Sequence, residues 1–317
     1  MTDEMVFGDE TNEQAGETGE KGKDGLRLTD ISTVRALMDK HGITFRKEFG
    51  QNFLINPSVL ERIAAQAEGN VLEIGPGIGS LTRELAKNAE KVVCVEIDRG
   101  LIPVLGETLG DYPNVTVIND DVMKVGLPEF LDEHFGSREY SVCANLPYNI
   151  TTPVLMKLCE TEARPRSVTV MIQKEVARRL SAPAGSPEYG AVTAALSYYG
   201  TVRRLFDVTA GNFLPAPKVD STVIRIDMHP QPPVPVRDEK LLFSVIRAAF
   251  GERRKTLLNA LSSGLGGQFT KEETAEAIGK AGIDPRTRGE TLSLERFAAV
   301  ADALAETAGQ REKRGDQ

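Results

Sequence analysis

The chain has 317 residues, of which 40% are hydrophobic and three are cysteines, and its formal net charge is −8. This length and apolar content are sufficient for one large domain and one smaller domain. Three irregularly spaced cysteines exclude a disulfide framework and a four-cysteine zinc site, and no apolar stretch approaches the ~20 residues that span a bilayer. We therefore expect a cytoplasmic protein with no membrane association and no metal site, in which Cys94 and Cys143 are small buried hydrophobic residues.

The negative charge is concentrated at the N-terminus. Residues 1–25 contain eight acidic residues and two lysines, a net of −6, so the rest of the chain carries only −2. Because this segment is also poor in large apolar residues, we predict that it is a disordered acidic tail. Basic residues cluster at 178–179, 203–204 and 253–255, so the remainder can form a basic face despite the acidic total.

The middle of the chain predicts a parallel sheet. Five β-branched runs alternate with segments of helical spacing such as 81–87 and 101–109, and the runs are Val71–Ile74, Lys91–Val95, Val115–Ile118, Tyr140–Ala144 and Ser167–Ile172. Apolar strands that alternate with helices indicate a sheet covered on both faces. Ligands of such sheets bind at the carboxyl ends of the strands, so we expect the functional residues directly after each run.

Two further strands are predicted at 202–208 and 219–226, where they would form a hairpin at one sheet edge and complete a mostly parallel seven-stranded sheet. The proline-dense segment 229–236 predicts a stiff linker. We therefore place an α/β domain at residues 26–230 and a small all-α domain at residues 237–317.

The C-terminal region shows helical patterns only, at 241–250, 253–261, 271–280 and 293–307. Thr270, with Glu273 three residues later, has the spacing of a capping box at the start of the third helix.

The first run ends in a glycine-rich turn. Gly75 and Gly77 would let the backbone turn sharply and approach a ligand closely. A dinucleotide fingerprint requires G-x-G-x-x-G, but here Gly79 comes one position early and Ser80 occupies the place of the last glycine. A pyrophosphate site is therefore disfavoured.

Acidic residues end the next two strands. Glu96 lies about 20 residues after the glycines, where a partly solvated carboxylate can accept from both hydroxyls of a ribose, and Asp121 can accept from an adenine amine. Either acid alone could instead be a helix cap or an exposed turn. Together with the glycine turn, they indicate a nucleoside ligand without a phosphate tail, for which S-adenosylmethionine is the candidate.

The fourth run ends in Asn145-Leu-Pro-Tyr148. An exocyclic adenine amine is a poor nucleophile because its lone pair is delocalised into the ring, and acceptors on its N–H groups would free that lone pair. The Asn145 side-chain oxygen can be one acceptor, and a backbone carbonyl held by the fixed φ of Pro147 can be the other. Tyr148 offers a surface on which an extruded base can stack, worth ~1–3 kcal/mol.

These residues belong to a series of motifs that resembles the KsgA family of small-subunit (16S) rRNA adenine N6,N6-dimethyltransferases. The motifs occur in the family's order, and they are Lys47–Leu54, Glu73–Gly77, Asn145–Tyr148, Gln173–Val176, Phe213–Ser221 and Phe250–Leu257. The resemblance implies a Rossmann-like methyltransferase fold and S-adenosylmethionine as the cofactor. It also implies dimethylation of two adjacent adenosines in a hairpin loop near the 3′ end of 16S rRNA, within the small ribosomal subunit or its precursor, by a monomer with a role in subunit biogenesis.

By the same resemblance, the cofactor-contacting residues are Asn52, Leu54, Gly75, Gly77, Glu96, Asp121 and Asn145, and the segment around Asn52 would close over the cofactor like a lid. We expect Arg253, Arg254 and Lys255, at the start of a C-terminal helix, to contact RNA phosphates.

Two other functions fit parts of the sequence. A 23S rRNA adenine methyltransferase of the macrolide-resistance type would share the catalytic domain, but Leu146 and the 250–257 segment favour the small-subunit enzyme. A non-catalytic ribosome-assembly factor would keep the fold, yet such a protein would be expected to have lost Asn145 or the glycine turn, and both are intact.

Overall fold

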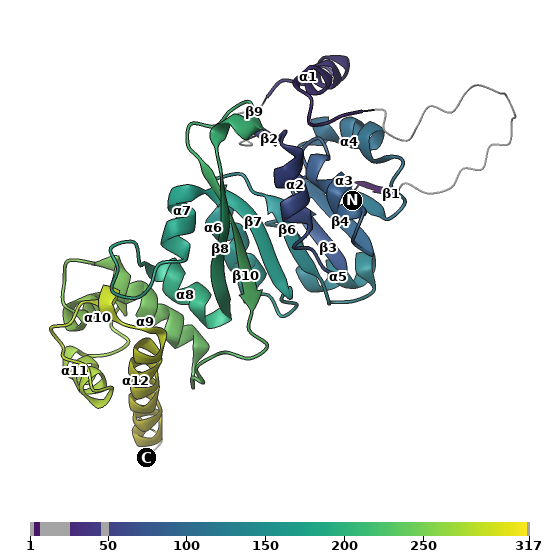
Figure 1. The fold of residues 1–317 in the computed structure, drawn as a ribbon. Helices are drawn as coiled ribbons and strands as arrows, with labels where there is room; N and C mark the ends of the chain where they lie inside the picture. The colour runs from purple at the N-terminus through teal and green to yellow at the C-terminus, as the bar shows by residue number, and fades with distance from the viewer. Residues whose placement is uncertain (1–2, 7–25, 46–50, 316–317) are drawn as a thin grey trace, which may run out of the picture. The chain divides into compact units, whose positions relative to one another are not determined.

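The computed structural model describes residues 3–6, 26–45 and 51–315, and their side chains from 26 to 45 and from 51 to 311 (Figure 1). Within these ranges the strands are β1 (Asp3–Val6), β2 (Phe53–Leu54), β3 (Asn70–Ile74), β4 (Lys91–Glu96), β5 (Val115–Asn119), β6 (Ser141–Asn145), β7 (Ser167–Gln173), β8 (Gly200–Val208), β9 (Phe213–Leu214) and β10 (Ser221–Met228). The helices are α1 (Ile31–Lys40), α2 (Pro57–Ala64), α3 (Ser80–Ala86), α4 (Ile102–Leu109), α5 (Leu127–Phe135), α6 (Thr151–Glu160), α7 (Lys174–Leu180), α8 (Ala191–Tyr199), α9 (Glu239–Gly251), α10 (Leu257–Gly264), α11 (Lys271–Lys280) and α12 (Leu294–Gly315).

The large sheet has the strand order β1-β5-β4-β3-β6-β7-β10-β8. Strands β5, β4, β3, β6 and β7 are parallel, and β10 runs antiparallel to β7. The chain builds β3, β4 and β5 outward in one direction and then crosses back to place β6 on the other side of β3. This reversal is a topological switch point, where the carboxyl ends of neighbouring strands leave room for a ligand.

The five predicted parallel strands and the edge hairpin are confirmed, with most strand ends within one or two residues of those predicted. The α/β fold with a mostly parallel sheet is therefore the predicted one. The all-α character of the C-terminal region is also confirmed, as are the capping box of Thr270 with Glu273 and the burial of Cys94 and Cys143.

The prediction of disorder for the whole of residues 1–25 is wrong at Asp3–Val6. This segment forms β1, which pairs antiparallel with β5 from Asp3 opposite Asn119 to Val6 opposite Thr116. Without it, β5 would present unpaired backbone groups at a sheet edge, and an added strand satisfies them whatever its net charge. The other residues of the predicted tail lie outside the described residues.

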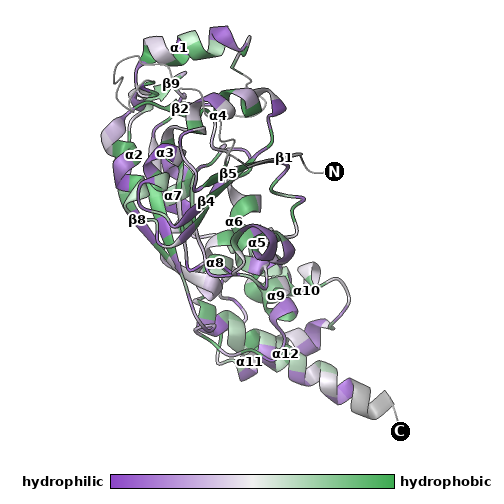
Figure 2. Ribbon diagram, turned by 90° about the vertical axis from the view of Figure 1, so that its right-hand side faces the viewer, coloured by the Kyte–Doolittle hydropathy of each residue, from purple (hydrophilic) through white to green (hydrophobic). Residues whose placement is uncertain are grey.

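Both faces of the sheet are covered, as the apolar strands predicted. Val71, Val92 and Cys94 belong to a core that includes residues of α2, α3 and α4. Leu72 and Val93, which alternate with them and so lie on the other face, are fully buried as well. Helix α5 shows both hydrophilic and hydrophobic residues in Figure 2, and its buried residues include Leu127, Phe130 and Leu131.

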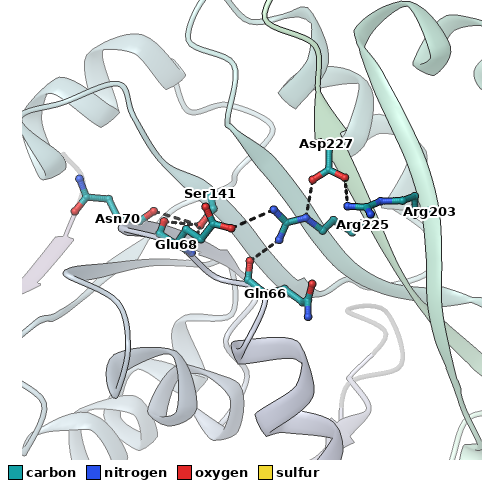
Figure 3. Close-up of polar contacts among 7 residues, drawn as sticks. All are labelled: Gln66, Glu68, Asn70, Ser141, Arg203, Arg225 and Asp227. Atoms are coloured by element: carbon teal, nitrogen blue, oxygen red, sulfur yellow. Dashed lines mark hydrogen bonds and ion pairs between the residues drawn. The ribbon is translucent and has the colours of Figure 1, made fainter.

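A polar network fixes the amino ends of the parallel strands (Figure 3). The Arg225 guanidinium donates to Asp227 Oδ1 at 2.7 Å, to the Gln66 carbonyl at 2.7 Å and to Glu68 Oε1 at 3.4 Å. The Ser141 hydroxyl at the start of β6 donates to the Glu68 carbonyl at 3.1 Å. The loop between α2 and β3 is thus tied to β6 and β10 at the edge opposite the carboxyl ends of the strands.

The chain divides into two compact units, and the division is not a single cut. The first unit contains residues 1–177 and 203–228, and the second contains 178–202 and 229–317. Residues 178–202 therefore group with the C-terminal helices, which the sequence analysis did not anticipate.

Aromatic residues explain this grouping. Tyr198 and Tyr199 of α8 pack against Phe243 of α9 with ring centroids 5.5 and 5.4 Å apart, and the Tyr199 hydroxyl donates to Glu239 at 3.1 Å. Aromatic pairs of this kind add stability beyond the area that they bury.

One predicted helix begins later than expected. Residues 253–256 were predicted to open a helix, but α10 starts at Leu257, and Glu252 after α9 has the non-helical dihedral angles φ −131° and ψ 64°. Arg253, Arg254 and Lys255 therefore lie in the turn between α9 and α10. No helix in the described part of the chain combines the length and apolar composition needed to cross a membrane.

Candidate active site

A pocket lies at the switch point, at the carboxyl ends of β3, β4, β5 and β6. The residues predicted from the sequence to hold the cofactor or to act in catalysis all line it, and they are Asn52, Leu54, Gly75, Gly77, Glu96, Asp121, Asn145, Pro147 and Tyr148. All of them belong to the first compact unit. Residues from separate parts of the sequence are thus brought together in one pocket.

The glycine turn between β3 and α3 needs its glycines for two reasons. Gly75 and Gly77 have φ of +68° and +63°, a region that other residues rarely adopt. A Cβ at Gly77 would lie 3.1 Å from the Phe53 ring, which is tight, whereas a Cβ at Gly75 would meet no protein atom within 4 Å. The turn therefore packs closely on β2 at one glycine and leaves open space at the other.

Glu96 is buried, with 4% of its surface exposed, and the expectation of a partly solvated carboxylate is wrong. Its Oε1 accepts the Asp98 backbone N–H at 2.7 Å and its Oε2 accepts that of Gly77 at 3.3 Å. Burial raises the pKa of Glu96 to about 7, although these two backbone donors oppose the shift. A carboxylate has about four acceptor positions, so the bonds from Asp98 and Gly77 do not fill it and it can still accept from ligand hydroxyls.

The pocket contains residues that sequence reasoning missed. Glu73 is fully buried at the end of β3, and burial raises its pKa to about 7. Ile97, directly after Glu96, is 51% exposed although it is a large apolar residue, and it lines the pocket with Val122. The signal available in the sequence was an apolar residue one position past a strand-end carboxylate, since such a side chain offers a surface for a flat ring.

Asp121 lines the pocket and also stabilises the turn that follows β5. Its Oδ1 accepts the Met123 backbone N–H at 2.9 Å, and its Oδ2 lies 3.8 Å from Lys124 Nζ. Of the two alternatives considered from the sequence, the turn is therefore present at one oxygen and no helix cap is, because the next helix starts at Leu127. The other oxygen is the candidate acceptor for an adenine amine.

The segment around Asn52 is held against the glycine turn and the end of β4. Phe53 and Leu54 form β2, which pairs with Leu214 and Phe213 of β9. The Gln51 amide donates to Asp98 Oδ2 at 2.8 Å. Residues 46–50, which carry part of the first motif, lie outside the described residues.

The segment at Asn52 also orients Asn145. The Asn145 side-chain NH₂ donates to the Asn52 carbonyl at 3.0 Å, which leaves the Asn145 side-chain oxygen as an acceptor. The carbonyl of Pro147 accepts the Ile150 N–H at 3.2 Å and the Thr151 hydroxyl at 3.3 Å, so it is used within the turn that starts α6.

The basic residues predicted to contact RNA differ in their surroundings. Arg253 donates to the carbonyls of Pro187 and Tyr189, both at 3.1 Å, and to Glu290 at 3.2 Å. Lys255 pairs with Glu252 at 2.7 Å, and Arg254 is exposed. Arg253 therefore ties together three segments of the second unit, and Arg254 and Lys255 are the members of the cluster better placed for phosphates.

A doubly wound sheet with a glycine turn after its first parallel strand, and a pocket at its switch point that contains Glu96, Asp121 and Asn145, defines a Rossmann-like fold with a ligand site. The sequence profile of the ribosomal RNA adenine dimethylase family matches residues 42–306, and the chain belongs to that family. This confirms the resemblance seen in the motifs.

Individual proteins agree with the family match. A protein of Shouchella clausii (strain KSM-K16) named ribosomal RNA small subunit methyltransferase A is 48% identical over 286 residues, which cover 88% of this chain and 97% of that protein. The solved structure of a dimethyladenosine transferase from Plasmodium falciparum has a TM-score of 0.66 and 25% identity, and covers 78% of this chain and 95% of its own. That of the 23S rRNA methyltransferase ErmE has a TM-score of 0.61 and 26% identity, and covers 80% of this chain and 100% of its own.

Proposed function

We propose that this protein uses S-adenosylmethionine to dimethylate N6 of two adjacent adenosines in a hairpin loop near the 3′ end of 16S rRNA. It acts as a monomer in the cytoplasm, on the small ribosomal subunit or its precursor, and so contributes to subunit biogenesis. The observation that carries this proposal is the orientation of Asn145, whose side-chain oxygen is left to accept from a target amine in the pocket that also holds Glu96.

The pocket residues fit a nucleoside cofactor. Glu96 would accept the ribose hydroxyls, the Asp121 carboxylate would accept from the adenine amine, and Ile97 and Val122 would contact the adenine ring. Gly75 leaves space for close approach of the ligand, and the segment from Asn52 to Leu54 would cover it. When bound, the cofactor supplies an electrophilic methyl group.

The residues after β6 would prepare the target nitrogen. The Asn145 oxygen would accept one N–H of the adenine amine, and the Leu146 carbonyl, which precedes the rigid Pro147 ring, would accept the other. Two acceptors favour a pyramidal nitrogen and make its lone pair available for attack. Tyr148 would stack on the extruded base and offset part of the few kcal/mol that unstacking costs.

RNA binding by the second unit would rest on Arg254 and Lys255, because Arg253 is engaged by protein carbonyls and Glu290. Phosphate contacts and shape dominate the recognition of folded RNA. A 23S rRNA substrate is the alternative, and the much higher identity with a small-subunit methyltransferase than with ErmE favours the small-subunit RNA. A non-catalytic assembly role is disfavoured by the complete pocket.

The test compares Asn145→Ala with Asn149→Ala, a matched control at an exposed asparagine four residues further on. Removing an acceptor that acts in the transition state should lower methyl transfer to unmethylated small-subunit RNA about a hundredfold or more. Cofactor affinity, measured by calorimetry, should change little, and the control should keep full activity.

Methylated adenines are quantified by mass spectrometry in small-subunit and large-subunit RNA. Turnover of Asn145→Ala within a fewfold of wild type would remove the proposed mechanism. Methylation of the large-subunit RNA instead would assign the substrate to the 23S class.

A further inference from the structure

The hydroxyl of Tyr148 is held by a residue 73 positions further along the chain. Tyr148 Oη and Ser221 Oγ are 2.8 Å apart, and either hydroxyl can donate in this hydrogen bond. Ser221 is fully buried and does not itself line the described pocket. It ends the Phe213–Ser221 motif, for which the cofactor and the target amine provide no role.

The position of Ser221 is fixed by the sheet. It is the first residue of β10 and lies opposite Gln173, the last residue of β7. Directly beside it, the Lys174 backbone N–H donates to the Asp220 carbonyl at 3.0 Å. A hydroxyl at this point is therefore attached to rigid backbone rather than to a loop.

The hydrogen bond restrains where the Tyr148 ring can lie. The ring is attached to the chain in the turn after β6 and is now also held at its far tip, so a rotation about χ1 that moved the ring would break the bond to Ser221. Because Oη lies on the axis of the ring, the bond fixes the ring's position and leaves its face available. A surface held in place before binding loses less freedom when a base stacks on it.

We propose that Ser221 is a positioning residue for the target base, which it serves by anchoring the stacking ring of Tyr148. This proposal rests on the proposed function, because it requires that the base stacks on Tyr148. It gives the Tyr148 hydroxyl a role in orientation and none in proton transfer, and it explains why tyrosine rather than phenylalanine ends the tetrad.

The experiment uses the full chain and an RNA hairpin with 2-aminopurine at one target adenosine, whose fluorescence changes when the base leaves its neighbours and stacks on protein. Ser221→Ala and Tyr148→Phe each remove the hydrogen bond from one side. We expect each to reduce the fluorescence change on binding and to lower kcat with unmethylated RNA by about two- to tenfold, the range for one hydrogen bond. The double variant should be no worse than either single variant, and cofactor affinity should stay at the wild-type value.

Thr222→Val is the matched control. Thr222 is the next residue, is equally buried, and donates to Asp207 Oδ1 at 2.7 Å, so its replacement removes a comparable, partly buried hydrogen bond that does not involve Tyr148. This variant should keep the wild-type fluorescence change. If Ser221→Ala does not fold, Tyr148→Phe still removes the same bond from the pocket side.

A wild-type fluorescence change in the variant that lacks the bond would overturn the proposal, as would losses that add in the double variant or an equal loss in Thr222→Val. Tyr148→Ala distinguishes the stacking role of the ring from the anchoring role of Ser221. If it retains full activity, the stacking role in the proposed function is wrong. If it loses activity while Ser221→Ala and Tyr148→Phe are unaffected, only the anchoring role is wrong.

Discussion

The buried carboxylate of Glu96 makes nucleoside binding depend on pH near neutrality. Its pKa in the unliganded protein is raised to about 7 by burial, and ribose hydroxyls that donate to it favour the ionised form. Binding must then remove a proton from Glu96 whenever the pH is below this value. The affinity should therefore fall as the pH falls, and the loss should be small above pH 8.

The size of the effect follows from the pKa. For one group that must be ionised, the apparent Kd increases by the factor 1 + 10^(pKa − pH), so a pKa of about 7 gives about tenfold weaker binding at pH 6 than at pH 8. Glu96→Gln cannot ionise and should bind with an affinity that is flat over this range. Glu96→Ala should lose roughly 1.5–3 kcal/mol of binding free energy at pH 8.

Calorimetric titration with 5′-methylthioadenosine is the suitable assay, because this nucleoside lacks the amino and carboxyl groups of the cofactor and brings no titration of its own between pH 6 and pH 8. Glu73 has a similarly raised pKa and is the competing source of a pH effect. Glu73→Gln should therefore keep the wild-type pH dependence. A pH dependence that persists in Glu96→Gln and disappears in Glu73→Gln would refute the assignment of the ribose to Glu96.

Three other predictions concern stability and RNA. Because the folded protein holds the proton of Glu73 up to about pH 7 while the unfolded chain releases it near its ordinary pKa of 4.5, wild-type stability should fall between these values as the pH rises. Glu96 has the same raised pKa, so in thermal melts at pH 5 and pH 8 Glu73→Gln should lose only the part of this dependence that Glu73 contributes. Replacing Arg254 and Lys255 with Ala should reduce the slope of log RNA affinity against log salt by roughly 0.7–0.9 for each true phosphate contact. Arg253→Ala should chiefly lower the melting temperature, because Arg253 is bonded to protein carbonyls. An unchanged slope in the Arg254 and Lys255 variant would mean that RNA binds elsewhere on the protein. Deletion of residues 1–25 removes β1 as well as a net charge of −6. RNA affinity should be unchanged or slightly higher because negative charge is lost, and a filter-binding assay that showed lost affinity in a variant with the wild-type melting temperature would contradict this.

The parallel strands could be predicted from the sequence because each buried parallel strand appears there as a short apolar run. Each candidate ligand then follows a run, as Glu96 and Asn145 do. The burial of Glu96 could not be predicted in this way, since it depends on how the glycine turn folds over the end of β4. The same limit applies to Tyr148 and Ser221, whose contact joins two motifs across the width of two strands.

The misplaced start of α10 has a local cause. Arg253, Arg254 and Lys255 are good helix formers, and their propensity favoured a helix that began with them. The available signal against it was Thr256, a residue type preferred at the position that precedes a helix, and it is the N-cap of α10. The guanidinium of Arg253 donates to the carbonyls of Pro187 and Tyr189, which lie 66 and 64 residues earlier. A contact over this sequence distance cannot be predicted from a local sequence pattern.

The interleaving of the two compact units decides how this protein can be dissected. A truncation after residue 228 would retain Tyr198 and Tyr199 but delete Phe243 and Glu239, so it would leave the aromatic face of α8 in water and invite aggregation. A fragment that starts at residue 229 would lack α8 altogether. Separate expression of the first unit therefore requires a short linker in place of residues 178–202. Separate expression of the second unit requires that residues 178–202 be fused to the C-terminal helices.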